Sequence, residues 1–401
     1  MKKNTKHYFC LKGKQAEDIV HELAEKTFLT DWCYPNPKWP DGKELCDLLV
    51  IFGDIAIIFQ IKNLACDSSG QFNQSEIEKN LNQLIGAKRH LFELEKDIQL
   101  SNPRRGNESF NSKGIKEIYL LSIIFGENKS FCFGGQPYKG HYIHVFDEQF
   151  TEIALNELDT IADFIDYLRK KEDLLTKGSS KIIVNGGEEE LLAYYLLNNR
   201  NFDELKKDTV NFIGEDIWKH LKDKDEYKRK KEADKISYGW DGIINRAHEG
   251  KHKYESVARE LARPNRLLRR ALSKAFIEAH MKAHRGNKDG IYRSMISIDG
   301  VTYCFLFQND YDEPRVKRQS MLSLMCMIAR IKIKENRKVI GIATETKLKP
   351  VSYYDFLLLD MPELTQEFID KVQQAQKETG IFVNPITHTG REDEYPSVED
   401  N

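Results

Sequence analysis

Two polar residues end an apolar segment in a way that would place their side chains together. The apolar segment 55–59 is followed by Gln60, Ile61 and Lys62. Residues two apart in a strand point to the same side of a sheet. We therefore expect Gln60 and Lys62 to emerge side by side from the end of an otherwise buried strand.

A carboxylate is expected to join this pair from the neighbouring segment. Asp47 directly precedes the apolar segment 48–52, and Gly53-Asp54 separates that segment from 55–59. A short turn between two apolar segments is typical of a β-hairpin. Folding the hairpin back on itself brings Asp47 to the end of the sheet that carries Gln60 and Lys62.

A fourth group comes from the first predicted helix, near residues 15–28, where apolar residues recur at helical spacing. At about 100° per residue, Glu17 lies within about 70° of the centre of the apolar stripe. On the same arithmetic, Asp18, Glu22 and Glu25 lie roughly 150° or more away and face solvent. Glu17 is therefore the carboxylate of this helix that leans toward the sheet.

These residue types suit the hydrolysis of a phosphodiester. That reaction needs a divalent cation to activate water and to offset the charge that develops on the phosphate. Mg²⁺ prefers carboxylate and carbonyl oxygens, which Asp47, Gln60 and Glu17 supply. An amine such as that of Lys62 stabilises negative charge in the transition state.

The motifs GKQAE on the helix, ELCD before one strand and FQIK at the end of the next resemble the PD-(D/E)xK nuclease superfamily, in its Mrr-like and archaeal Holliday-junction-resolvase-like branch. The resemblance covers roughly residues 10–150. It implies that Asp47 binds the metal, Gln60 contributes an oxygen, Lys62 orients the attacking water, and Glu17 is the carboxylate of the helix. The sequence departs from the common pattern because Gln60 stands where most members have Asp or Glu. An amide oxygen is a weaker ligand than a carboxylate.

The order of predicted elements also agrees with this resemblance, and it places the chain in the α/β class with a restriction-endonuclease-like α-β-β-α-β core. Within the nuclease domain, assigned to residues 1–177, the expected elements are helix 15–28, strands 48–52 and 55–59, helix 74–94, strands 115–125 and 141–146, and one closing helix at 151–175. Residues 102–114 are expected to form a polar loop, and Gln83 is a weaker candidate for a site residue on the second helix.

A second, mixed α+β domain is assigned to residues 178–390, beginning at the Gly-Ser-Ser stretch 178–180. Its first part to about residue 283 reads as helical and charged. Strands at 291–298 and 301–308, joined by a turn at Asp299-Gly300, then precede further helices and strands. The polar stretch 391–401 is predicted to be a flexible tail.

A basic segment in the second domain is the candidate surface for nucleic acid. Eight Lys and Arg residues lie within the 27 positions from 259 to 285, whereas the whole chain has a net charge of −2. Such a segment either forms a solvated helix face or follows a phosphate backbone, without reading bases. The residues assigned to nucleic-acid binding are Arg259, Arg263, Arg266, Arg269, Arg270 and Lys274.

Two alternatives to a nuclease stay open. One is a catalytically silent nuclease fold that serves as a nucleic-acid-binding or assembly module, although the intact Lys62 argues against it. The other is a zinc metallopeptidase, because His248-Glu249-Gly250-Lys251-His252 matches the pattern HExxH. Gly250 weakens the helix that this motif requires, and the flanking residues are polar.

Composition limits the remaining possibilities. Seven cysteines occur singly, without CxxC pairs, which argues against a disulfide framework or a structural zinc site and favours the cytoplasm. No apolar run approaches the roughly 20 residues of a membrane span. We expect a Mg²⁺-dependent endonuclease, with Mn²⁺ as a substitute, that acts on nucleic acid, with DNA as the expected substrate and RNA as the open alternative. The resemblance further implies bacterial restriction or anti-phage defence, with a helicase or sensor protein or a second copy of the chain as partner.

Overall fold

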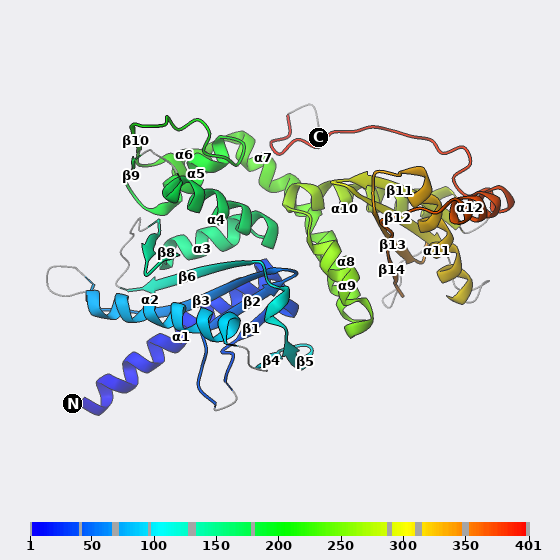
Figure 1. Ribbon diagram of the computed structural model, residues 1–401. Coiled ribbons are helices and arrows are strands. Elements are labelled where there is room, and N and C mark those ends of the chain that lie inside the picture. The colour runs from blue at the N-terminus through cyan, green and yellow to red at the C-terminus, as the bar shows by residue number, and fades with distance from the viewer. Residues whose placement is uncertain are drawn as a thin grey trace. The chain divides into compact units, whose positions relative to one another are not determined.

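The computed structural model describes residues 2–39, 42–65, 72–94, 98–126, 134–177, 181–286, 291–308, 315–346 and 353–397. The chain is an α/β protein that divides into two compact units, residues 1–224 and 225–401 (Figure 1). Each unit is built around its own β-sheet.

The first unit has a six-stranded mixed sheet in the order β1-β2-β3-β6-β8-β7. β2 and β3 form an antiparallel hairpin through Gly53 and Asp54, as predicted, and Gly53 adopts a positive φ of 63°. β3, β6 and β8 run parallel to one another. The strands are β1 (Cys33–Pro35), β2 (Leu48–Phe52), β3 (Ile55–Asn63), β6 (Glu117–Phe125), β7 (Gln136–Tyr138) and β8 (His141–Asp147).

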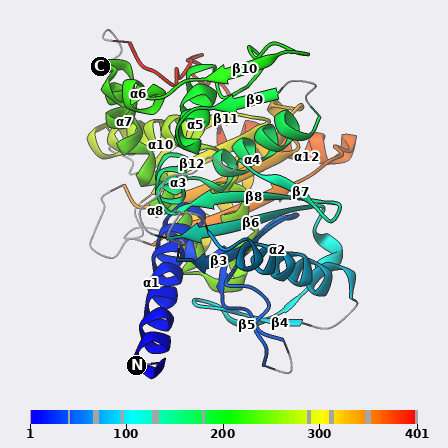
Figure 2. The same ribbon diagram turned by 90° about the vertical axis from the view of Figure 1, so that its left-hand side faces the viewer.

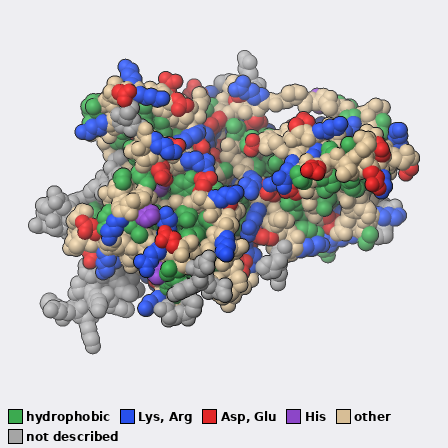
Figure 3. Space-filling view, in the orientation of Figure 1, with side chains coloured by type: hydrophobic (Ala, Val, Ile, Leu, Met, Phe, Trp, Pro, Cys, Tyr) green, Lys and Arg blue, Asp and Glu red, His purple; other side chains and the backbone are tan. Residues whose placement is uncertain are grey.

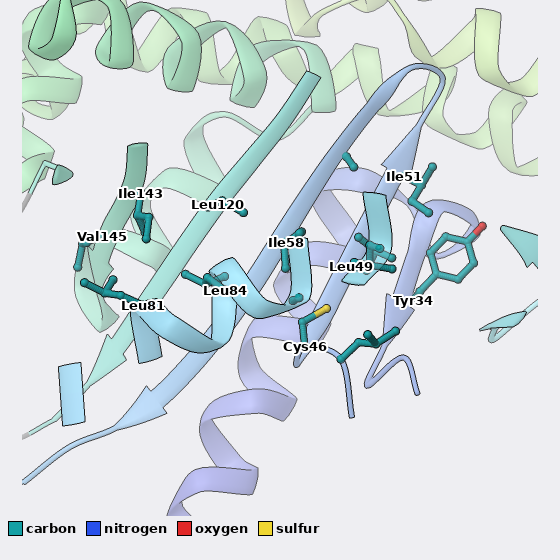
Figure 4. Packing of buried hydrophobic residues seen from close by; sticks show 14 of the residues in the cluster. Tyr34, Cys46, Leu49, Ile51, Ile58, Leu81, Leu84, Leu120, Ile143 and Val145 are labelled. Atoms are coloured by element: carbon teal, nitrogen blue, oxygen red, sulfur yellow. The ribbon is translucent and has the colours of Figure 1, made fainter. Parts of the chain in front are cut away.

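Helices cover both faces of this sheet (Figures 1 and 2). One face packs beneath α2 (Gln74–Lys88), where Ile58, Leu84 and Leu120 belong to a single apolar core (Figure 4). Because side chains alternate along a strand, the neighbouring residue Phe59 faces the other side. There it meets Phe28 at the end of α1 (Lys2–Phe28), while α3 (Glu148–Glu157) and α4 (Ile161–Thr176) cover the rest of that face.

Two segments that were predicted as single regular helices are interrupted. The single helix predicted at 151–175 is two helices, α3 and α4, because Thr160 adopts an extended conformation and caps α4 through the amide of Asp163. The helix predicted at 74–94 is α-helical to Lys88 and continues as a π-turn, Arg89–Glu93. The first helix begins before its predicted start.

The predicted polar loop at 102–114 contains a strand. β4 (Ile98–Asn102) and β5 (Gly106–Phe110) form a separate antiparallel pair. Asn102 holds this pair against the sheet, since its side-chain amide donates to the carbonyl oxygens of Thr30, Asp31 and Cys33. These bonds join segments that are far apart in the chain, so local sequence patterns do not reveal them.

The first unit extends beyond the boundary predicted near residue 178. Its last elements are β9 (Lys181–Val184), α5 (Glu188–Leu197), β10 (Val210–Ile213) and α6 (Ile217–Asp223). Lys171 on α4, fully buried, forms an ion pair of 2.5 Å with Glu188 on α5. Burial raises the pKa of Glu188 to about 7 although Lys171 opposes that shift. The Gly-Ser-Ser stretch 178–180 lies outside the described residues, and the compact units divide instead between Lys224 and Asp225.

The second unit has a four-stranded sheet in the order β11-β12-β13-β14. The predicted hairpin of β11 (Ile291–Ile298) and β12 (Val301–Gln308) is confirmed, with Asp299 and Gly300 at positive φ. The expected helices precede it, and the later strand and helix elements follow. They are α7 (Asp225–Asp234), α8 (Tyr238–His248), α9 (Glu255–Ala262), α10 (Arg266–Gly286), α11 (Arg315–Lys332), β13 (Lys338–Thr344), β14 (Asp355–Asp360) and α12 (Gln366–Thr379).

This second sheet is also covered on both faces. Phe305 on β12 packs against Trp240 of α8 and Phe276 of α10. The adjacent Cys304 faces the opposite side and belongs to a core with Met325 of α11. Each unit is therefore a sheet between layers of helices, and each has its own apolar core.

The stretch predicted to be a flexible tail is held against the second unit up to residue 397. Glu392 forms an ion pair of 2.7 Å with Arg270, and the carbonyl oxygens of Asp393 and Glu394 also accept from that guanidinium. The carbonyl of Pro396 accepts from Arg229 at 3.1 Å. Within the described part of the chain, no helix has the length and apolar character needed to cross a membrane.

Candidate functional site

Asp47 directly precedes β2, as the hairpin predicts, and the residue is only 6% exposed. Its Oδ2 accepts hydrogen bonds from the backbone amide of Ile61 and, at 2.7 Å, from Nε2 of Gln60. Its carbonyl oxygen accepts from the backbone amide of Asn36 and contacts Nε2 of His21 on α1, both at 2.9 Å. Asp47 thus joins the hairpin, the preceding loop and the first helix.

The environment of Asp47 opposes its negative charge. The pKa of Asp47 is raised to about 7, first by burial and in addition by the nearby carboxylates of Glu17 and Glu44. The hydrogen bonds from Ile61 and Gln60 act in the opposite direction but do not compensate. A carboxylate held in this way gains stability from any cation that approaches it.

The hydrogen bond between Gln60 and Asp47 fixes the orientation of the amide. Nε2 of Gln60 points to Asp47, so its Oε1 points elsewhere, and neither Oε1 of Gln60 nor Oδ1 of Asp47 bonds to a described residue. Gln60 is 7% exposed. The pair therefore retains two oxygen atoms that are available as ligands.

Lys62 lies on the same face of β3 as Gln60 but is directed toward α2. Its Nζ is 3.7 Å from Oε2 of Glu76, a carboxylate that also lies 3.9 Å from Nζ of Lys79. The side chain of Lys62 is 29% exposed, so this ion pair is shielded only in part from solvent. The amine is thus held by a weak contact with Glu76, which a stronger anion can replace.

Two buried polar residues next to this group were missed by the sequence patterns. Ser122 on β6 lies opposite Gln60 in the parallel register, and its Oγ accepts from Nδ2 of Asn80 on α2 at 2.8 Å. Asn80 is fully buried, and its Oδ1 has no hydrogen-bond partner among the described residues. Gln83, the weaker candidate on this helix, is exposed. The sequence did contain a signal for Asn80, because it is a polar residue at a core position of α2.

Glu17 approaches the site from α1, as its helical position predicts. It is half-buried, whereas Asp18 and Glu22 are exposed; Glu25, which the same arithmetic placed toward solvent, is half-buried as well. Burial raises the pKa of Glu17, and the charges of Glu44 and Asp18 raise it further. Glu44, three residues before Asp47, is an acidic neighbour that the sequence patterns did not single out. Its influence on both Glu17 and Asp47 marks one acidic region at this end of the sheet.

These donors fit a hard divalent cation. Mg²⁺ is commonly held by one or two carboxylates, with water and substrate oxygens completing its coordination. Asp47 and Glu17 supply the carboxylates, and Oε1 of Gln60 supplies a neutral oxygen. Among the described residues, no group of three or more His, Cys, Asp or Glu side chains is gathered closely enough to hold a metal ion.

The assignment of Arg266, Arg269 and Arg270 to nucleic-acid binding was wrong, because all three are buried. Arg266 and Arg269 both bind Asp241, at 2.8 and 2.7 Å. Arg270 has no exposed surface and binds Asp234 and Glu392. Guanidinium groups committed in this way to internal carboxylates cannot also reach a phosphate backbone.

The other cations of this segment are only partly available to a ligand. Arg259, Arg263 and Lys274 are partly exposed, but each forms an ion pair with an acidic neighbour. On the face of the molecule drawn in Figure 3, Lys and Arg side chains are interspersed with Asp and Glu. The high density of cations in this segment therefore reflects internal ion pairs of the second unit.

The HExxH pattern does not form the helix that a zinc peptidase needs. α8 ends at His248, and residues from Lys251 to Tyr254 form a short 3-10 helix. The side chain of His248 is buried and lies 3.4 Å from Glu255, while Glu249 is exposed and bound to Arg246. The pattern therefore does not lie on one continuous helix, which the motif requires.

The described geometry thus brings Glu17, Asp47, Gln60 and Lys62 to one end of the first sheet, whereas the arginine-rich segment belongs to the second unit. The first group offers two carboxylates and an amide oxygen, which are the ligand types that Mg²⁺ prefers, and Lys62 stands on the same strand as Gln60. The chain matches no family model, no curated protein and no solved structure.

Proposed function

We propose that the first unit is a metal-dependent nuclease with a restriction-endonuclease-like core, which hydrolyses phosphodiester bonds. The observation that carries this proposal is the burial and the raised pKa of Asp47. Its carboxylate is buried and has a pKa of about 7, beside the amide of Gln60 and on the strand pair that carries Lys62. An internal carboxylate with so perturbed a pKa in a polar cluster is typical of a functional site.

The arrangement of elements supports the same assignment. α1, the hairpin β2-β3, α2 and β6 follow one another in the chain, with β3 parallel to β6 and α2 within the crossover between them. This is the α-β-β-α-β order that the resemblance to PD-(D/E)xK nucleases implies. The candidate side chains come from α1, from the start of β2 and from the second half of β3.

Each residue then has a distinct role. Asp47 and Glu17 would hold Mg²⁺, or Mn²⁺ in its place, together with Oε1 of Gln60. The bound metal would activate water and offset negative charge on the scissile phosphate. Lys62 would exchange its weak contact with Glu76 for the phosphate or the attacking water. Asn80 and Ser122, which lie on α2 and β6 next to β3, would help to fix the position of Gln60.

The biological context follows from the resemblance alone. We propose DNA as the substrate, an endonuclease activity in bacterial restriction or anti-phage defence, and a cytoplasmic location. A helicase, a sensor protein or a second copy of the chain is the partner that such systems imply. The second unit, whose arginines at 266, 269 and 270 are buried, is then an effector or protein-recognition unit.

The test compares two lysines that contact the same carboxylate. Lys62→Ala and Lys79→Ala each remove one ion pair to Glu76, but only Lys62 stands on β3 beside Gln60. Each protein is incubated with plasmid, linear duplex, single-stranded DNA and RNA, in Mg²⁺, in Mn²⁺ and in EDTA. We expect metal-dependent cleavage that falls by orders of magnitude in Lys62→Ala and is unchanged in Lys79→Ala. Equal activity of both variants would remove Lys62 from the proposed machinery.

A catalytically silent nuclease fold is the second candidate, and two observations favour it. Oδ2 of Asp47 is already occupied by Ile61 and Gln60, and Lys62 is paired with Glu76. If wild-type protein cleaves none of the four substrates with either metal yet binds one of them, this second function replaces the first.

A further inference from the structure

A cavity in the second unit involves none of the candidate nuclease residues. It has a volume of about 250 Å³ and is lined by Gly239, Gly242, Ile243 and Arg246 of α8, Ser273, Phe276 and Ile277 of α10, and Tyr354. α8 and α10 pack against each other in this unit (Figure 1). This volume is slightly below the roughly 300–1,000 Å³ of typical small-molecule pockets, so it suits a small ligand.

Two glycines of α8 create this space, and packing does not require either of them. Gly239 and Gly242 are three residues apart, so they share one face of the helix. A methyl group at Gly242 would meet no atom within 4 Å, and at Gly239 it would meet only Oγ of Ser273 at 3.5 Å, an ordinary contact. Glycine destabilises a helix relative to alanine. Two glycines in a helix of 11 residues are explained if the cavity that they leave binds a ligand.

Ser273 supplies a hydrogen-bonding group to the cavity. The residue is 2% exposed, and its Oγ has no hydrogen-bond partner in the described part of the chain. Helical serines ordinarily satisfy a buried hydroxyl by donating to the carbonyl four residues earlier. A buried hydroxyl without a partner carries a desolvation cost, which a bound polar group would relieve.

The remaining lining specifies the other parts of a ligand. Phe276 and Tyr354 contribute aromatic rings and Ile243 an aliphatic side chain, which suit a flat apolar ring. Arg246 is 45% exposed and uses only Nη1, which donates to both oxygens of Glu249. The rest of its guanidinium is available to an anion.

We propose that this cavity binds a small aromatic anion, whose ring lies between α8 and α10, with a ring substituent on Ser273 and the anionic group on Arg246. The site belongs to the second unit and does not depend on the nuclease assignment. A mononucleotide has this chemistry, and so does a simple aromatic carboxylate.

The experiment measures binding to the full-length protein by calorimetry. The probes are adenosine 5′-monophosphate and salicylate as aromatic anions, adenosine as the ring without the anion, and ribose 5-phosphate as the anion without the ring. We expect at least one aromatic anion to bind, and to bind at least tenfold more tightly than adenosine or ribose 5-phosphate. Failure of both aromatic anions to bind at millimolar concentration would overturn the proposal.

Two substitutions at one glycine locate the binding. Gly242→Leu fills the cavity and should reduce affinity at least tenfold, and Arg246→Gln should abolish the preference for the anion. Gly242→Ala is the matched control for the helix, with a melting temperature at or above that of the wild type and a smaller loss of affinity. Should Gly242→Leu misfold, Ser273→Ala still tests the site by a loss of affinity. Binding that neither Gly242→Ala nor Ser273→Ala weakens would place the ligand elsewhere.

Discussion

Replacing Asp47 by asparagine shows how much the buried charge of Asp47 lowers the free energy of unfolding. The carboxyl of Asp47 has an ordinary pKa of 3.8, and the fold raises it to about 7. The folded protein therefore holds a proton between these pH values that the unfolded chain releases. Stability conferred by this proton is complete below pH 3.8 and is lost as the pH rises through 7. Above pH 7, the site without metal is destabilised by its own charge.

The size of this effect follows from the two pKa values. A difference of about 3 pH units corresponds to about 4 kcal/mol, of which about 3 kcal/mol falls between pH 5 and pH 8.5. The amide that replaces the carboxyl in the variant Asp47→Asn is neutral throughout. Relative to the wild type, we therefore expect the variant to gain up to about 3 kcal/mol of stability over this pH range in EDTA.

Urea unfolding followed by tryptophan fluorescence measures this difference at pH 5, 6, 7 and 8.5. Three of the four tryptophans, Trp32, Trp39 and Trp218, lie in the first compact unit, so the signal reports mainly on that unit. Glu78→Gln, which removes an exposed carboxylate of α2, is the control and should show a small difference at every pH. A stability difference between Asp47→Asn and the wild type that does not change with pH would refute the reasoning.

The same experiment includes the metal. Magnesium at 100 times its dissociation constant should stabilise the wild type by about 2.7 kcal/mol at pH 8.5. It should leave Asp47→Asn unchanged, because the neutral amide removes the principal ligand charge. Equal stabilisation of both proteins would mean that magnesium binds elsewhere.

Two further substitutions test other parts of the molecule. Gln60→Glu removes the Nε2 donor to Asp47 and adds a carboxylate, so we expect the variant to be less stable in EDTA. Its metal binding, measured by calorimetry at pH 8.5, should be as tight as that of the wild type or tighter. Weaker metal binding would show that Gln60 has a structural role only. Arg269→Ala leaves a buried ion pair broken and should cost about 3–5 kcal/mol of stability, whereas Arg263→Ala, at an exposed pair, should cost about 1 kcal/mol or less. Thermal unfolding distinguishes the two, and a loss no larger in Arg269→Ala than in Arg263→Ala would contradict the buried network.

The sequence by itself determined those features that depend on neighbours in the chain. The alternating and continuous apolar segments predicted β2, β3, β6, β8, β11 and β12, and the pairs Gly53-Asp54 and Asp299-Gly300 predicted both hairpin turns. The hairpin alone fixes Asp47 beside Gln60 of β3, because register follows from a two-residue turn. Helical periodicity likewise placed Glu17 on the side of α1 toward the sheet.

Only the tertiary structure decided what distant segments do to one another. An arginine-rich helix has the same sequence pattern whether it faces solvent or internal acids, and Asp234, Asp241 and Glu392 settle that it faces acids. Asn80 became part of the site because β6, which follows much later in the chain, placed Ser122 beside it. The pKa of Asp47 depends on burial and on charges from Glu17 and Glu44, and burial is a property of the packed fold, which no local pattern contains.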